Sequence, residues 1–326
     1  MSTLHRPRIG YAAALLCVGL LAAIPGCREV SGPCPVATIV VTPDPLRLPA
    51  NTIGQFTATG RDQTGNTMPT SATWSVVGGG GTIDSDSGLF TAGPNPGTFT
   101  GTVRATDGTL SGLATVIVTA PVLPATLGSV ETFAVLAGST VTNTGATTTI
   151  EGNVGVSPGN AIAGMPAGQP TGGSIHAGDT TAGAAQTALT ALYNDLAGRA
   201  CGTNLSSEDL GGMTLAPGVY CFNTSAGLTG TLTLNGQGNP DAIFIIQVAS
   251  TLTTASHAVI ALSGGAQAAN VYWQIGSSAT LGTGTAFQGN LVALESITLN
   301  AGSRLTGRAL ARNGAVTIDS SALSLP

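Results

Sequence analysis

The stretch Ser296-Ile297-Thr298-Leu299-Asn300-Ala301-Gly302 sets the pattern of the C-terminal part of the chain. Apolar and polar residues alternate and a Gly closes the segment, as in a short, half-buried strand that ends in a tight turn. Equivalent apolar residues are Leu252, Leu281, Leu299 and Ile318, which lie 29, 18 and 19 residues apart. Such intervals are typical of a parallel β-helix, so these four side chains should point inward and stack.

A row of polar residues accompanies the stacked apolar positions. Because side chains alternate across a strand, this row should lie on one exposed face. It consists of Thr251, Thr253, Thr280, Thr298, Asn300 and Thr317. Thr is common in exposed strands, so the row by itself does not indicate a ligand.

The segment from Thr180 to Leu196 breaks the strand pattern. Its apolar residues recur every three or four positions, Asp179 or Thr180 can cap its start, and Gly198 can end it. We predict a helix of roughly 18 residues. Its apolar stripe should lie against a face of the β-helix.

The N-terminal half has a different strand pattern. Short alternating runs between residues 36 and 119 are separated by turn residues at intervals typical of a β-sandwich. The segment resembles the bacterial immunoglobulin-like domains of group 2 in Ile39–Pro43, Thr73–Val76 and Gly88–Ala92. Trp74 is then a core residue, and residues 120–126, with two prolines, are a stiff linker. We interpret this domain as a spacer.

Composition excludes several classes of function. Charged residues make up 8 % of the chain, the net charge is −5 and there is no Lys, which argues against a nucleic-acid partner. The acidic residues do not recur at the strand spacing, and the His and Cys residues form no metal or nucleophile motif. We therefore expect neither an enzyme nor a cofactor or metal site.

The first residues resemble an export signal. A positive start and the apolar run from Tyr11 to Ile24 predict a signal peptide over residues 1–26. Ile24-Pro25-Gly26-Cys27 resembles the lipobox of bacterial lipoproteins, which implies acylation of Cys27, with residues 27–35 as a tether. The expected location is the outer membrane or cell surface through a membrane anchor, with plain secretion as the alternative. Export also favours a structural disulfide between Cys201 and Cys221.

Residues 127–326 resemble a known family. The segments that carry the resemblance are Phe133–Gly145, Gly152–Gly159, Leu215–Tyr220, Phe244–Gln247, Asn270–Gln274 and Gly307–Thr317. They are similar to the microbial ice-binding proteins with the DUF3494 domain. The resemblance implies a discontinuous right-handed parallel β-helix with an α-helix packed alongside, and an ice crystal surface as the partner. The expected fold class is thus all-β with one long helix.

The same resemblance implies a Thr-(Ala/Gly)-x-(Thr/Asn) pattern on the ice-binding face. The complete and partial copies predict an ice-binding set of Thr144, Thr147, Thr254, Ser256, Thr283, Thr285 and Ser303. The row that begins at Thr251 is the alternative ice face, and the sequence does not decide between the two. His257 and Arg304 are bulky, so we expect modest ice affinity. A cell-surface adhesin that binds polysaccharide or protein is the alternative function, and the oligomeric state stays open.

Overall fold

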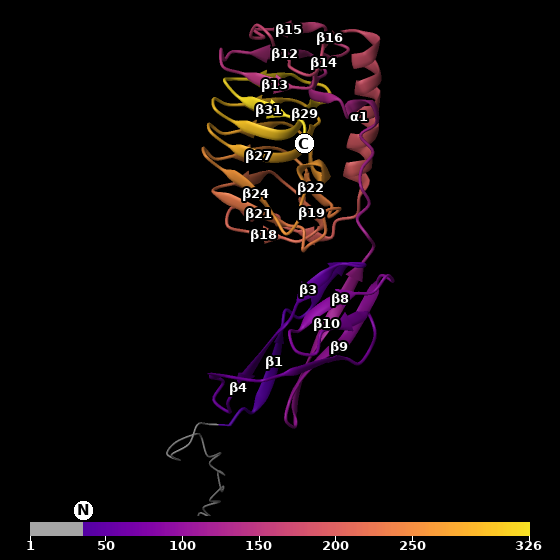
Figure 1. Cartoon of the computed structure of the whole chain (residues 1–326), viewed down its shortest axis with the longest axis vertical. Helices are drawn as coiled ribbons and strands as arrows, with labels where there is room; N and C mark the ends of the chain where they lie inside the picture. Colours follow the sequence, from indigo (N-terminus) through magenta and orange to yellow (C-terminus); the bar gives the residue numbers. More distant parts are fainter. Residues whose placement is uncertain (1–34) are drawn as a thin grey trace, which may run out of the picture.

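The computed structural model describes residues 35–326, which form an N-terminal all-β unit and a larger β-helix with one long helix at its side (Figure 1). Three sheets of the N-terminal unit enclose one apolar core, in which Trp74 lies against Phe56 with ring centroids 6.2 Å apart. Trp74 is buried, as predicted. The strands are β1 (Thr38–Thr42), β2 (Leu46–Pro49), β3 (Ile53–Gln55), β4 (Thr57–Arg61), β5 (Thr67–Met68), β6 (Thr73–Val76), β7 (Gly81–Ile83), β8 (Leu89–Ala92), β9 (Gly97–Asp107) and β10 (Leu110–Thr119).

The β-helix has three faces of parallel strands, which we name A, B and C, and each coil runs from B through C to A. Face B consists of β20 (Ala226–Leu228), β23 (Leu252–Thr254), β26 (Ala279–Leu281), β28 (Ile297–Leu299), β30 (Val316–Ile318), β12 (Thr140–Asn143) and β15 (Ala161–Ala163), in that spatial order. Leu252, Leu281, Leu299 and Ile318 are all buried. All four point inward, as predicted, and Leu281, Leu299 and Ile318 stack as register partners. Leu252 is the register partner of Ala279 and so belongs to the neighbouring stack.

Two strands run across both other faces. The first halves of β27 (Ala286–Ala293) and β29 (Arg304–Ala311) lie on face C and their second halves lie on face A. Gly289 and Gly307 stand at the corner with φ of 108° and 149°. A Cβ on Gly307 would collide with the backbone O of Gly289, so only glycine lets the strand bend here.

The remaining strands complete these two faces. Face C also holds β18 (Thr214–Leu215), β21 (Thr231–Asn235), β24 (Val259–Ser263), β31 (Ala322–Ser324) and β13 (Thr149–Glu151). Face A also holds β17 (Thr203–Asn204), β19 (Gly218–Phe222), β22 (Phe244–Val248), β25 (Val271–Ile275), β11 (Phe133–Ala137), β14 (Asn153–Val156) and β16 (Ile175–Ala177). The 3-10 turns η1 (Gly128–Val130) and η2 (Ala268–Asn270) precede β11 and β25.

The stack does not follow the order of the chain. Strands β11, β12 and β13 pair with the last strands, β29, β30 and β31, and β14 and β15 continue the stack beyond them. The first coil of the domain is therefore built onto its last coil. The structure thus agrees with the expected discontinuity.

Helix α1 (Thr180–Gly198) runs along face A (Figure 1). Asp179 caps its start, accepting a hydrogen bond from Ala182 N at 2.8 Å. Its buried stripe of Ala185, Leu189, Leu192 and Leu196 packs on Ile245, Tyr272, Val292 and Leu310 of face A. The predicted helix and its packing against the β-helix are both confirmed.

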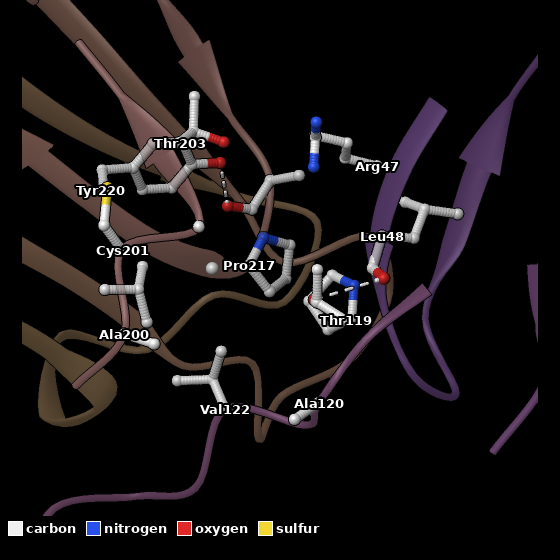
Figure 2. Close-up of a pocket in the computed structure, with 15 residues that line it drawn as sticks. Arg47, Leu48, Thr119, Ala120, Val122, Ala200, Cys201, Thr203, Pro217 and Tyr220 are labelled. Carbon is white, nitrogen blue, oxygen red and sulfur yellow. Dashed lines mark hydrogen bonds between the residues drawn. The ribbon is translucent and has the colours of Figure 1, made fainter. Parts of the chain in front are cut away.

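The N-terminal unit meets one end of the β-helix at a seam that encloses a cavity of about 210 Å³ (Figure 2). Arg47 and Leu48 of β2 line one side, and Pro217 and Tyr220 line the other. The Tyr220 hydroxyl donates to the backbone O of Ala216 at 2.7 Å, and burial raises the pKa of Tyr220 to about 12. The phenol is therefore neutral at pH 7, and its hydrogen is donated to Ala216.

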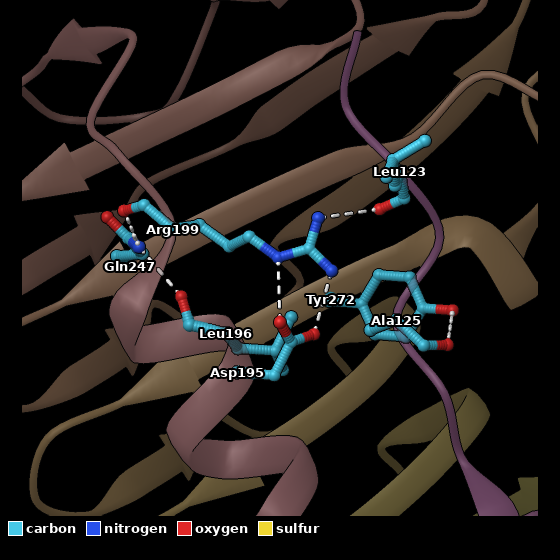
Figure 3. A network of polar contacts seen from close by, with 7 residues as sticks. All are labelled: Leu123, Ala125, Asp195, Leu196, Arg199, Gln247 and Tyr272. Carbon is cyan, nitrogen blue, oxygen red and sulfur yellow. Dashed lines mark hydrogen bonds and ion pairs between the residues drawn. The ribbon is translucent and has the colours of Figure 1, made fainter. Parts of the chain in front are cut away.

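The linker is fixed to the β-helix (Figure 3). Arg199, which pairs with Asp195 at the end of α1, donates from Nη1 to the backbone O of Leu123 at 3.0 Å. The Tyr272 hydroxyl donates to the backbone O of Ala125 at 3.3 Å. Gln247 donates to the backbone O atoms of Leu196 and Arg199 and so satisfies the last turn of the helix. The linker is held by these side chains as well as by its prolines.

A disulfide joins Cys201, just after α1, to Cys221 of β19, with Cα atoms 5.8 Å apart. It ties the end of the helix to face A at the end of the stack that begins with β17. Among the described residues, no helix is long and apolar enough to cross a membrane. The predicted signal peptide, the lipobox, Cys27 and all of the tether except its last residue lie outside the described residues.

Candidate functional site

The first predicted set of site residues lies at the corner where face B turns into face C. Thr144, Thr147, Ser256 and Thr283 are exposed there, in the turns of three coils. The turns between β28 and β29 and between β30 and β31 separate the coil of Thr283 from that of Thr144. They have Ala301 and Ser320 at the place of Thr283, and Asn300 and Asp319 at the place of Thr144. These four residues therefore do not form one continuous row.

Three members of that set point inward, which corrects the prediction. Thr254, Thr285 and Ser303 are 3 %, 0 % and 0 % exposed. The hydroxyls of Thr254 and Thr285 lie 2.8 Å apart, and Ser303 Oγ donates to the backbone O of Asn300 at 2.6 Å. Hydroxyls that are buried and hydrogen-bonded inside the protein cannot contact an ice crystal. We remove these three residues from the predicted ice-binding set.

The alternative row lies on face B and projects outward. Thr253, Thr280, Thr298 and Thr317 are register partners in four successive strands, and each alternates with a buried residue. Thr251 and Asn300, the other two members, flank this row and are partly exposed. The expectation that this row shares one exposed face is confirmed.

The row continues through a residue that the sequence pattern did not reveal. Thr142 of β12 is the register partner of Thr317. The chain reaches β12 long before β30, so only the discontinuous stacking places these two Thr side by side. The result is a column of five Thr, which we name the threonine column: Thr142, Thr317, Thr298, Thr280 and Thr253.

A second column of small side chains runs beside the threonine column. Its members precede the five Thr by two residues and are Thr140, Ala315, Ser296, Ser278 and Thr251. Neither column contains a charged residue. Along each strand the two columns are roughly 6.6 Å apart, and successive strands are about 4.8 Å apart. Together they form a regular, uncharged grid of hydroxyl and methyl groups.

The other two faces lack such a grid. Helix α1 covers face A. Face C has the charged side chains of Arg304 and Glu151 and the amide of Gln288 on its outer side. His257 lies in the turn between β23 and β24, so neither bulky residue that led us to expect modest affinity lies in the two columns.

No reactive constellation competes with face B in the described part of the chain. Groups of three or more His, Cys, Asp or Glu that could hold a metal are absent there. The closest acid–imidazole pair, His176 and Asp179 at 2.8 Å, belongs to the cap of α1. The seam cavity has mainly apolar walls.

Comparisons with known proteins agree with this geometry. The model of the family described as Ice-binding-like matches residues 135–324. An ice-binding protein of Nostoc sp. (strain HG1) is 51 % identical over 199 residues, which cover 61 % of this chain and 73 % of that protein. Ice-binding protein 1 of Shewanella frigidimarina (strain NCIMB 400) is 31 % identical over 334 residues, covering 88 % of this chain and 36 % of that protein.

A solved structure has the same fold. The ice binding protein from an Antarctic biological consortium superposes with a TM-score of 0.61 at 49 % identity. The match covers 64 % of this chain and 94 % of that one. The family match over residues 135–324 includes every strand of face B and all β-helix strands from β12 onward.

Proposed function

Because the chain belongs to the Ice-binding-like family, we propose that it binds ice and that face B is the surface that meets the crystal. The observation that carries this assignment is the threonine column, whose five members are in register on successive strands. The relatives named above are ice-binding proteins, and this activity is what we carry over to the present chain.

A regular array of rigid side chains suits an ice surface. Ice is an uncharged lattice, so a surface that matches it must hold weak contacts at fixed intervals. The β-branch of Thr restricts its side chain to few rotamers, and the strands fix the spacing between them. Little conformational entropy is then lost on contact, and many weak contacts act together.

Face B suits this role better than the other surfaces. Hydrated charges such as Arg304 on face C cost free energy when they are taken out of water. The exposed turn residues Thr144 and Thr283 border face B and are separated by coils that lack an equivalent Thr. We therefore assign the threonine column and its neighbouring column as the main contact surface.

The aromatic residues argue for ice over a polysaccharide. Sugar-binding surfaces expose aromatic rings for stacking, whereas Tyr220, Tyr272 and Trp273 are all buried in this β-helix. No specific feature of the described residues favours an adhesin that binds sugar or protein. Ice binding is therefore the function that we propose.

The test places one large side chain in the threonine column. Thr280→Tyr and Thr298→Tyr should lose most of the thermal hysteresis and of the inhibition of ice recrystallisation, because a protruding ring breaks the flat grid. The matched control is Thr233→Tyr on the outer side of face C, which should behave like the unmodified protein. Equal activity of the column variants and the control, all folded by circular dichroism, would refute the assignment of face B.

We also propose that the protein is exported and anchored through an acylated Cys27, which lies outside the described residues. The lipobox-like Ile24–Cys27 supports this proposal. In a bacterial host, the full chain should incorporate a labelled fatty acid and Cys27→Ser should not. Incorporation that persists in Cys27→Ser would place the acyl group on another residue, and a mature protein free of label would favour plain secretion.

The N-terminal unit is, in our proposal, an immunoglobulin-like spacer of bacterial group 2. The match to the Shewanella protein extends over 88 % of the chain and thus beyond the family region, which supports a shared arrangement. The unit has its own core and meets only one end of the stack (Figure 1). A spacer at that position leaves face B uncovered.

A further inference from the structure

Buried hydroxyls occupy the same place in four successive coils of the β-helix. Each is the last residue of the turn between faces B and C, directly before the first residue of a face C segment. The four are Thr285, Ser303, Ser321 and Thr148, and they are 0 %, 0 %, 2 % and 2 % exposed. The residues that follow them, Ala286, Arg304, Ala322 and Thr149, are register partners.

Three of these hydroxyls bond to the neighbouring coil. Thr285 Oγ1 lies 3.3 Å from the backbone O of Ala255. Ser303 Oγ lies 3.1 Å from the backbone O of Gly282 and shares its hydrogen with Asn300 O of its own turn, 2.6 Å away. Ser321 Oγ shares its hydrogen between the backbone O of Asp319 in its own turn, 2.8 Å away, and that of Asn300, 3.2 Å away. Ala255, Gly282 and Asn300 each directly follow a face B strand. Each of these three hydroxyls thus contacts the end of the face B strand in the preceding coil.

Both ends of this series continue through other buried polar groups. Thr148 Oγ1 donates to the side-chain O of Asn143, whose Nδ2 donates to the backbone O of Gly164 at 2.7 Å in the adjoining coil. At the other end, Thr254 Oγ1 contacts Thr285 Oγ1 and accepts from Gly282 N at 2.9 Å. These contacts connect the turns after β23, β26, β28 and β30, and separately the turns after β12 and β15.

We propose that this hydroxyl ladder (Thr148, Thr285, Ser303 and Ser321) positions face B and keeps the threonine column flat and evenly spaced; the inference rests on the proposed ice-binding function. Four of the five strands that carry the column have only three residues, so their own hydrogen bonds hold them weakly. Each of these carbonyls also accepts a backbone N–H of its own turn, so the hydroxyl supplies the additional buried bond that joins the turn to the neighbouring coil. The ladder residues therefore act on ice binding through the column and do not contact ice.

The test removes hydroxyls and keeps side-chain volume, in the full chain. Thr285→Val, Ser303→Ala and the double variant are compared with Thr285→Ser, which keeps the hydroxyl. Ile246→Val, a buried change on face A, is the control for general loss of stability. Thermal hysteresis, the melting temperature and the hydrogen exchange of backbone amides in the turns after β26 and β28 are measured for each.

We expect exchange in these turns to rise roughly fivefold or more for each hydrogen bond lost. Thermal hysteresis should fall in Thr285→Val and Ser303→Ala, remain in Thr285→Ser, and remain in Ile246→Val even where its melting temperature falls as much. If Ser303→Ala and Thr285→Val are folded and keep full hysteresis, or if hysteresis follows melting temperature wherever the change is made, the ladder has no positioning role.

Failure of the proposed function gives a different result. In that case the unmodified protein shapes no ice, and Thr280→Tyr changes nothing. Exchange in the turns then still decides whether the ladder fixes face B: faster exchange in Thr285→Val but not in Ile246→Val supports it, and equal exchange overturns it.

Discussion

At the scale of single residues, position along the coil decides what a Thr does. Thr280 lies in a strand of face B and projects outward, whereas Thr285, five residues later, is buried at the end of the turn. Thr285 follows Gly284 in a turn, and turn residues are usually exposed. The Thr-(Ala/Gly)-x-(Thr/Asn) pattern therefore placed Thr285 on the surface, while the coil geometry turns it inward to satisfy a carbonyl.

A single carboxylate gives a pH-dependent prediction. Asp179 accepts hydrogen bonds from Ala182 N and His176 Nδ1, each at 2.8 Å, and these lower the pKa of Asp179. A carboxylate with a lowered folded-state pKa adds stability above its unfolded pKa of about 3.9, and this stability is lost as the pH falls through the folded-state pKa. Asp179→Ala should therefore lower the melting temperature at pH 7, and the difference should vanish in acid.

The control for this measurement is Asp241→Ala. Asp241 is exposed, and its carboxylate accepts no hydrogen bond from the described residues, so its removal should leave the melting temperature unchanged at either pH. A destabilisation by Asp179→Ala that is equally large at neutral and acid pH would contradict the cap.

At the scale of elements, helix α1 acts as the cover of face A. Face A is apolar on both sides in strands such as β11, whose residues are all buried, so it must be covered on the outside. The stripe from Ala185 to Leu196 supplies that cover. Coverage of face A by the helix leaves faces B and C as the exposed sides of the β-helix.

Leu189→Ala should lower the free energy of unfolding by about 2–5 kcal/mol, because Leu189 is fully buried between α1 and face A. Asn194→Ala on the exposed side of the helix should change it by no more than roughly 0.5 kcal/mol. Chemical denaturation measures both. Similar values for the two variants would mean that α1 does not depend on its contact with the β-helix.

The elements also show what could be predicted from the sequence. The alternation around Leu281 and Leu299 and the helical spacing up to Leu196 are local signals, and they predicted the inward stack and α1 correctly. The place of Thr142 in the threonine column could not be predicted, because its register partner, Thr317, lies on a strand that is remote in sequence. The pairing of β12 with β30 depends on the order in which coils stack, and no local pattern encodes that order.

At the scale of the whole molecule, the linker sets how the two units are joined. Arg199 and Tyr272 hold Leu123 and Ala125 against the β-helix, while β10 ends at Thr119. Only residues 120–122 lie between these two fixed points. The N-terminal unit therefore contacts the end of the stack that begins with β17 and β18, and face B is accessible along its length (Figure 1).

The most direct test of ice binding through face B is the uptake of fluorescently labelled full chain into a slowly growing ice crystal. We expect the unmodified protein and Thr233→Tyr to be concentrated in the ice, while Thr280→Tyr and Thr298→Tyr stay in the liquid. Exclusion of the unmodified, folded protein from ice would contradict ice binding. Uptake of all four proteins alike would contradict the role of face B.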